Sequence, residues 1–235
     1  MTRRFSDIKD DIIIEQIKEL NEGVYDPGIF KAFFLAGGPG SGKSYVQKKT
    51  TGGMGLKVVN SDDIYEKMLK DAGMDTTPED IYSDKGQEIR GRAKATTKRM
   101  QSNFLMGRLG VVIDGTGKDF EKIQRQAAAL KQLGYDTYMI FVNTSEEVAQ
   151  QRNQERKRTL PRDEVTKMWN GVQRNIGAFQ RFFGTKNFII LDNNGPNDDV
   201  LDMVFKRVRK LVTTPVKNYI AKQWIANELE KKRRR

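Results

Sequence analysis

Short apolar runs alternate with longer stretches of helical periodicity along most of the chain. The run at residues 31–36 leads directly into a glycine-rich loop, and similar runs recur further along. Brief apolar runs are typical of buried strands, whereas apolar residues spaced by three and four indicate helices. The pattern predicts strands at 31–36, 56–60, 110–114, 136–142 and 187–192. It predicts helices at 43–50, 61–72, 86–108, 119–133, 145–157, 163–183 and 197–212.

This alternation of strands and helices predicts the fold class. Strands separated by helices form crossover units, which build a mainly parallel sheet. We therefore expect an α/β fold of three layers, with a mainly parallel five-stranded sheet and helices on both of its faces.

The two ends of the chain depart from the central pattern. Residues 7–21 carry apolar side chains at helical spacing, and a turn at residues 25–28 follows them. Beyond residues 213–215 the chain is basic and includes one further helical stretch. We expect a central domain at 31–212, an N-terminal helical extension at 1–30 and a basic C-terminal helix and tail at 213–235.

Composition narrows the chemistry that the chain can perform. Cysteine and histidine are both absent, which excludes disulfides, thiolate metal sites, thiol nucleophiles and histidine bases. A general base must then be a carboxylate, a lysine or a tyrosine. The net charge of +11 favours polyanionic partners such as nucleic acid, although a solvated basic surface would give the same count. No long apolar run or signal-like start is present, so we expect a cytoplasmic protein without membrane contact.

The most specific motif is the loop that follows the first strand. It matches G-x-x-x-x-G-K-[ST] at every position, with a strand before it and a helix after it. Its residues are Gly37, Gly38, Pro39, Gly40, Ser41, Gly42, Lys43 and Ser44. In such a loop the backbone amides surround phosphate oxygens, the lysine reaches the β- and γ-phosphates, and the last hydroxyl binds Mg²⁺. The motif predicts binding of ATP and Mg²⁺.

Two further strands end in carboxylates. Asp114 follows the apolar run at 111–113, and an Asp at the C-terminal end of a parallel strand lies in the crevice where ligands bind. There it could hold Mg²⁺, or it could simply cap the next turn. Asp62 and Asp63 follow the strand at 56–60. One of them could accept a proton from an attacking hydroxyl, and the alternative is helix capping by Ser61 or Asp62.

Arginines cluster at the end of the helix predicted at 145–157. Arg152 and Arg156 lie four residues apart on one helical face, and a Pro-containing loop with Arg162 follows. An arginine-rich lid over a triphosphate would look like this, and so would a solvated charge run. Arg90, Lys94 and Lys98 form a second basic stripe, which either contacts a phosphodiester backbone or is solvated. Apolar positions at 169–183 are expected in the core rather than in a base-stacking surface.

Taken in this order, the motifs resemble those of the polynucleotide kinase and zeta-toxin group of P-loop kinases, in its phage-type form. The likeness covers about Lys31 to Leu191 and includes the Asn-Ser-Asp-Asp and Asp-Gly-Thr stretches and the Arg-Asn-x-x-Arg sequence. It implies that Asp62 is the general base, that Arg156 contacts the ATP phosphates, and that Arg152 lies near the adenine. The loop at residues 193–196, which contains Asn193 and Asn194, would form the other wall of the adenine site, with Asn194 as its cofactor-binding residue. Ser61 departs from the pattern, because polynucleotide kinase has an arginine beside its base.

The resemblance implies an ATP-dependent kinase with an arginine-rich lid, working in the host cytoplasm if it is phage-encoded. We expect the phosphate acceptor to be a hydroxyl of a polynucleotide or nucleotide. Two alternatives stay open: a zeta-toxin-like kinase of UDP-N-acetylglucosamine, and a nucleic-acid-associated ATPase that transfers no phosphate.

Overall fold

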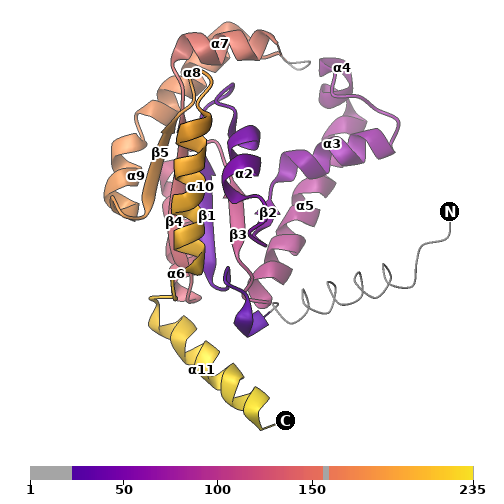
Figure 1. Ribbon diagram of the computed structural model, residues 1–235. Helices are drawn as coiled ribbons and strands as arrows, with labels where there is room; N and C mark the ends of the chain where they lie inside the picture. The colour runs from indigo at the N-terminus through magenta and orange to yellow at the C-terminus, as the bar shows by residue number, and fades with distance from the viewer. Residues whose placement is uncertain (1–22, 156–158, 235) are drawn as a thin grey trace, which may run out of the picture.

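The computed structural model describes residues 23–155 and 159–234. Within these residues five strands form one sheet in the order β2-β3-β1-β4-β5, and every neighbouring pair is parallel (Figure 1). The strands are β1 (Lys31–Ala36), β2 (Lys57–Val59), β3 (Val111–Asp114), β4 (Asp136–Asn143) and β5 (Phe188–Asp192). The predicted α/β fold is confirmed, and the sheet is parallel throughout. The helix predicted at 7–21 lies outside the described residues.

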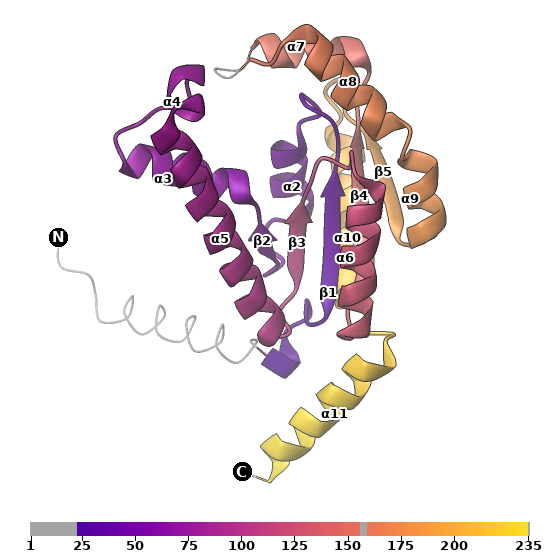
Figure 2. The ribbon, with the colours of Figure 1, turned by 180° about the vertical axis from the view of Figure 1, so that it is seen from behind.

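Helices cover both faces of this sheet, as the two opposite views in Figures 1 and 2 show. Helices α2 and α10 pack on one face, and α6 and α9 pack on the other. The helices are α2 (Lys43–Thr51), α3 (Ser61–Asp71), α4 (Pro78–Tyr82), α5 (Asp84–Met106), α6 (Phe120–Gln132), α7 (Glu146–Gln154), α8 (Arg162–Gln173), α9 (Ile176–Phe183), α10 (Asp198–Thr213) and α11 (Tyr219–Arg233), and a short 3₁₀ helix spans Gly23–Tyr25.

The central strand shows why the sheet is covered on both sides. All six residues of β1 are buried. Because successive side chains of a strand point to opposite faces, Phe33 and Leu35 pack with Val46 of α2, whereas Phe34 packs with Phe179 of α9. A continuous apolar run therefore predicts this strand better than strict alternation would.

Helices α3, α4 and α5 form a smaller unit beside β2 (Figure 1). Its core contains Tyr65, Leu69, Ile81 and Ile89. The sequence prediction missed α4, although Thr77 caps it by accepting a hydrogen bond from the Asp80 N–H at 3.3 Å and Pro78 occupies its first turn. Threonine followed by proline is a recognisable helix start, but five residues give no apolar periodicity.

The single helix predicted at 163–183 is wrong, because the chain forms two helices there. Helix α8 ends at Gln173 and α9 begins at Ile176. Between them the Asn175 side chain donates hydrogen bonds to the carbonyl oxygens of Gly117 (3.0 Å) and Lys118 (2.8 Å). These contacts tie the break to the loop after β3. Val172, Phe179 and Phe183 are buried, as predicted for core positions.

Helix α11 lies at the opposite end of the molecule from α7 and α8 (Figures 1 and 2). Its Trp224 ring packs edge-on against Phe30, with ring centroids 5.5 Å apart. Near it, Lys31 is buried and its Nζ lies 3.0 Å from Asp136 Oδ2. Within the described part of the chain, no helix combines the length and apolar character that a membrane crossing requires.

Candidate active site

The sheet order brings three strand ends together. Strand β3 lies between β1 and β2, and Leu35 of β1 pairs in register with Asp114 at the end of β3. The carboxyl ends of parallel strands share one edge of a sheet, so the segments that follow β1, β2 and β3 meet there. The Gly37 N–H also donates to the Thr116 carbonyl oxygen at 3.2 Å, which joins the glycine-rich loop to the loop after β3.

The glycine-rich loop needs glycine at two of its positions for steric reasons. Gly40 has a φ of +70° and Gly42 a φ of +80°, a region that side chains rarely permit. A Cβ atom on Gly40 would lie 2.5 Å from the Ala149 carbonyl oxygen of α7. The loop is therefore packed closely against α7, with no room for a side chain at Gly40.

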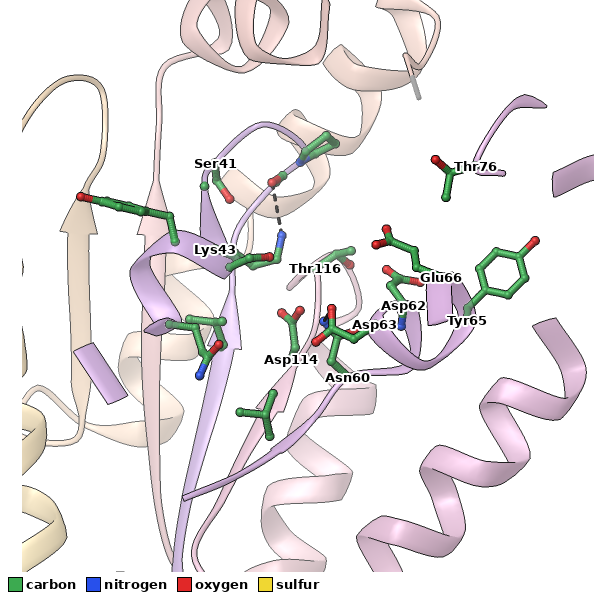
Figure 3. A pocket seen from close by; sticks show the side chains of 18 of the residues that line it. Ser41, Lys43, Asn60, Asp62, Asp63, Tyr65, Glu66, Thr76, Asp114 and Thr116 are labelled. Atoms are coloured by element: carbon green, nitrogen blue, oxygen red, sulfur yellow. Dashed lines mark hydrogen bonds between the residues drawn. The ribbon is translucent and has the colours of Figure 1, made fainter. Parts of the chain in front are cut away.

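Lys43 opens helix α2 and folds back over the loop. Its Nζ donates a hydrogen bond to the Gly37 carbonyl oxygen at 2.8 Å. A longer one, drawn as a dashed line in Figure 3, reaches the Gly38 carbonyl oxygen at 3.4 Å. Ser44 follows as the second residue of α2 and is exposed to the same cavity. The loop, the lysine and the serine thus line the same side of the cavity.

Asp114 lies below Lys43 in Figure 3, at the end of β3. Its Oδ1 atom is buried and has no hydrogen-bond partner within the described residues. Burial raises the pKa of this carboxyl group, Lys43 lowers it, and Asp62 and Asp63 raise it. A buried carboxylate oxygen without a donor nearby is suited to a cation.

Asn60 is the residue that caps helix α3. Its Oδ1 accepts a hydrogen bond from the Asp62 N–H at 2.8 Å, and its Nδ2 donates to Asp63 Oδ1 at 3.0 Å. The capping that we considered for Ser61 or Asp62 is thus performed by Asn60, and the Asp62 carboxylate is left facing the cavity (Figure 3). Desolvation, followed by the neighbouring Asp62, raises the pKa of Asp63.

These residues surround one open cavity of about 820 Å³. Figure 3 shows the order in which the side chains lie across the cavity. Lys43 lies on one side, and the carboxylates of Asp114, Asp63 and Asp62 come next. Thr76 and Tyr65 lie beyond them. The lining residues come from the glycine-rich loop, α2, α3, α4 and α5, with Leu160 and Met168 from the segment around α8. A cationic side and a row of carboxylates therefore share the same space.

The arginine cluster is described only in part. Arg152 Nη1 donates to the Gly40 carbonyl oxygen at 3.3 Å, which places this side chain on the glycine-rich loop. Asn153, which is buried, exchanges two hydrogen bonds with the backbone of Leu160, at 2.8 and 3.0 Å, and so joins the end of α7 to the residues just before α8. Arg156 lies outside the described residues.

The loop after β5 contributes Asn193, which the resemblance placed in the loop near the adenine without a role of its own. Asn193 is buried and its Nδ2 donates to the Ser41 carbonyl oxygen at 2.7 Å. Asn194, the residue predicted to bind the cofactor, is exposed and accepts a hydrogen bond from the Ser145 N–H at 2.6 Å. The sequence could not tell the roles of these two adjacent asparagines apart, because the roles differ only in the direction in which each side chain points.

Comparison with known proteins shows which family and fold the chain belongs to. No curated protein matches the chain. Among solved structures, a candidate kinase from Chloroflexus aurantiacus J-10-fl has a TM-score of 0.51 at 14% identity, covering 77% of this chain and 98% of that one. The PezAT toxin-antitoxin structure of Streptococcus pneumoniae has a TM-score of 0.51 at 16% identity, covering 97% and 98%. AvrRxo1-ORF1 in complex with AvrRxo1-ORF2 has a TM-score of 0.50 at 15% identity, covering 69% and 54%.

At these identities the structural similarities establish the fold, which is that of the P-loop kinases. Membership of a family is shown by a match of the sequence itself to a family model. The model described as "AAA domain" matches residues 33–175, which is more than half of the chain and includes the glycine-rich loop, Asp62, Asp114 and Arg152. The protein is therefore a member of the AAA domain family with a P-loop kinase fold.

Proposed function

We propose that the protein is an ATP-dependent kinase of the polynucleotide kinase and zeta-toxin group, which transfers the γ-phosphate of ATP to a hydroxyl. The observation that carries this proposal is the convergence of Lys43, Asp114 and Asp62 on a single cavity. The proposed kinase domain spans residues 31–212, and the segments 1–30 and 213–235 are extensions outside it.

The glycine-rich loop would hold the triphosphate. Its backbone amides and the α2 N-terminus attract phosphate oxygens, and Lys43 would exchange its bond to Gly37 for the β- and γ-phosphates. Arg152 already contacts this loop, and with Arg156 it would neutralise charge on the transferring group. Asn194 would form the wall of the adenine site.

The donor set at the centre of the cavity fits Mg²⁺. Ser44 and Asp114 would hold the ion, and the unpartnered Oδ1 of Asp114 supports this assignment. When bound, Mg²⁺ would offset the negative charge that builds up on the phosphate oxygens during transfer. Within the described residues no group of three or more acidic side chains forms a metal cage, which suits an ion held mostly by phosphate and water.

Asp62 is the proposed general base. The oxygen of the acceptor hydroxyl forms a bond to the γ-phosphorus, the bond from that phosphorus to the bridging oxygen breaks, and ADP leaves. The hydroxyl proton passes to the Asp62 carboxylate, which is free to accept it because Asn60 performs the capping. Asp63 is the alternative base, but its carboxylate already accepts a hydrogen bond from the Asn60 side chain at the start of α3.

For the acceptor we propose a hydroxyl of a polynucleotide or nucleotide. The net charge of +11 and the open cavity support it. A nucleotide sugar is the second candidate, because the motifs also resemble those of zeta-toxin-like kinases of UDP-N-acetylglucosamine.

Label transfer from γ-labelled ATP tests the proposal. The acceptor panel contains 5′-hydroxyl DNA and RNA oligonucleotides, DNA with hydroxymethyluracil, nucleosides and UDP-N-acetylglucosamine. We expect label on a nucleic acid or nucleotide, and its loss in Lys43→Ala. Label on the nucleotide sugar alone would select the second candidate. ATP hydrolysis without label on any acceptor would indicate an ATPase and overturn the kinase proposal.

A further inference from the structure

The far end of the cavity contains an arginine that the proposed reaction does not use. Arg90 extends from α5 and lines the cavity together with Tyr65 of α3. Its guanidinium carbon lies 5.7 Å from the centre of the Tyr65 ring, which is the distance of a cation–π contact. Figure 3 shows Tyr65 beyond Asp62 and Glu66 as seen from Lys43, so Arg90 lies at the end opposite the glycine-rich loop.

Arg90 is the one cation at this end among the described residues that line the cavity. The other two, Lys43 and Lys48, belong to α2 beside the glycine-rich loop. Asp62, Asp63 and Glu66 lie between the two groups. None of the described carboxylates forms an ion pair with Arg90, although its guanidinium has five N–H donors.

Tyr65 supplies an independent observation at the same place. The residue is 3% exposed, its ring lines the cavity, and its hydroxyl has no hydrogen-bond partner within the described residues. A buried hydroxyl without a partner is unfavourable, and native structures usually satisfy it with a side chain, water or ligand. Arg90 and Tyr65 therefore offer unused donors side by side.

We propose that Arg90, supported by Tyr65, holds a phosphate group of the acceptor. Guanidinium groups match the geometry of phosphate oxygens, and the three carboxylates would repel a phosphate from the rest of this end. The acceptor would bind with its phosphate at Arg90 and its hydroxyl at Asp62. This inference rests on the proposed function and names the residue that would recognise the phosphate of the acceptor, so nucleosides without a phosphate should be poor acceptors.

Paired acceptors that differ only in the phosphate test this inference. One pair is thymidine 3′-monophosphate and thymidine, and the other is N-acetylglucosamine 1-phosphate and N-acetylglucosamine. We expect Arg90→Ala to raise the KM for the phosphorylated member about 10- to 100-fold, as loss of a charged hydrogen bond does. The KM for ATP and the kcat should change little, and Arg90→Lys should recover part of the loss.

Arg92→Ala is the matched control, because Arg92 belongs to the same helix and is exposed. It should leave both members of each pair unaffected. An equal rise in KM for both members of a pair in Arg90→Ala would show a structural role and overturn the inference, as would an unchanged KM.

A binding measurement separates this inference from the kinase proposal. Calorimetric titration of thymidine 3′-monophosphate and UDP-N-acetylglucosamine is done with a non-hydrolysable ATP analogue and Mg²⁺ present, so that the glycine-rich loop is occupied. We expect binding of at least one ligand that weakens about 10-fold or more in Arg90→Ala, whether or not label is transferred. Absence of binding to the unaltered protein, or equal binding to the variant, would overturn the inference.

Discussion

Among single residues, the buried pair of Lys31 and Asp136 has the clearest energetic consequence. Lys31 is 1% exposed, and desolvation lowers its pKa while the contact with Asp136 raises it. Asp136 also accepts a hydrogen bond from the Lys217 N–H at 3.0 Å, which ties the segment before α11 to the sheet. Breaking such a pair by removing one partner costs more than the pair contributes, because the other charge stays buried.

We therefore predict that Asp136→Asn lowers the free energy of unfolding by about 3 kcal/mol near neutral pH. The folded protein binds fewer protons than the unfolded chain between the lowered pKa of Lys31 and its ordinary value of 10.5, so stability rises with pH in that window. Without Asp136 the pKa of Lys31 falls further and the window opens at a lower pH. The deficit of the variant should shrink as the pH rises towards 10.

Urea unfolding of both proteins at several pH values measures this effect. Asp202→Asn serves as the control, because Asp202 pairs with Lys206 at the surface, where both side chains are more than 60% exposed. A deficit in Asp136→Asn that stays constant with pH would contradict the assignment to Lys31.

Among the elements, the turn between β5 and α10 is tied to the glycine-rich loop. The side chain of Asn193 reaches the Ser41 carbonyl oxygen, and a Cβ atom on Gly42 would lie 2.5 Å from Asn193 Nδ2. The loop is therefore fixed from two sides, by Asn193 and by Arg152 on Gly40. Fixing a phosphate-binding loop before the ligand arrives reduces the entropy lost on binding.

We predict that Asn193→Ala weakens ATP binding about 5- to 10-fold, which corresponds to the net value of one hydrogen bond. Calorimetric titration with ATP and Mg²⁺ measures the change. Asn197→Ala is the control, because Asn197 lies in the same turn and donates to the Asp192 carbonyl oxygen instead. Equal affinities in the two variants would show that Asn193 does not position the loop.

The same elements show how far the sequence alone can be interpreted. Strand ends are marked by apolar runs, and a parallel sheet forces such ends together, so Lys43, Asp62 and Asp114 could be placed in one crevice in advance. The break at Asn175 could not, because it depends on carbonyl groups of a loop more than 50 residues away. Arg90 was named only as one member of a basic stripe and Asn193 only as part of the loop after β5, since their individual contacts depend on which way a side chain points.

At the scale of the whole molecule, one end of the sheet is covered by packed residues and the other end carries the cavity. At one end α11 packs against Phe30, and the buried Lys31–Asp136 pair lies there. At the other end the cavity is lined by the glycine-rich loop and α3, together with Leu160 and Met168. A rigid parallel sheet between them lets the loops around the cavity differ in sequence while the phosphate-binding loop keeps its place.

The most direct test of the account measures ATP binding and label transfer side by side in Asp62→Asn. With the best acceptor of the panel, we predict a loss of transfer of about 100-fold or more, as removal of a general base produces, with ATP affinity unchanged. Asp63→Asn is the matched control and should retain most of the transfer. Full transfer by Asp62→Asn, or a loss in Asp63→Asn alone, would contradict the assignment of Asp62 as the base that activates the acceptor hydroxyl.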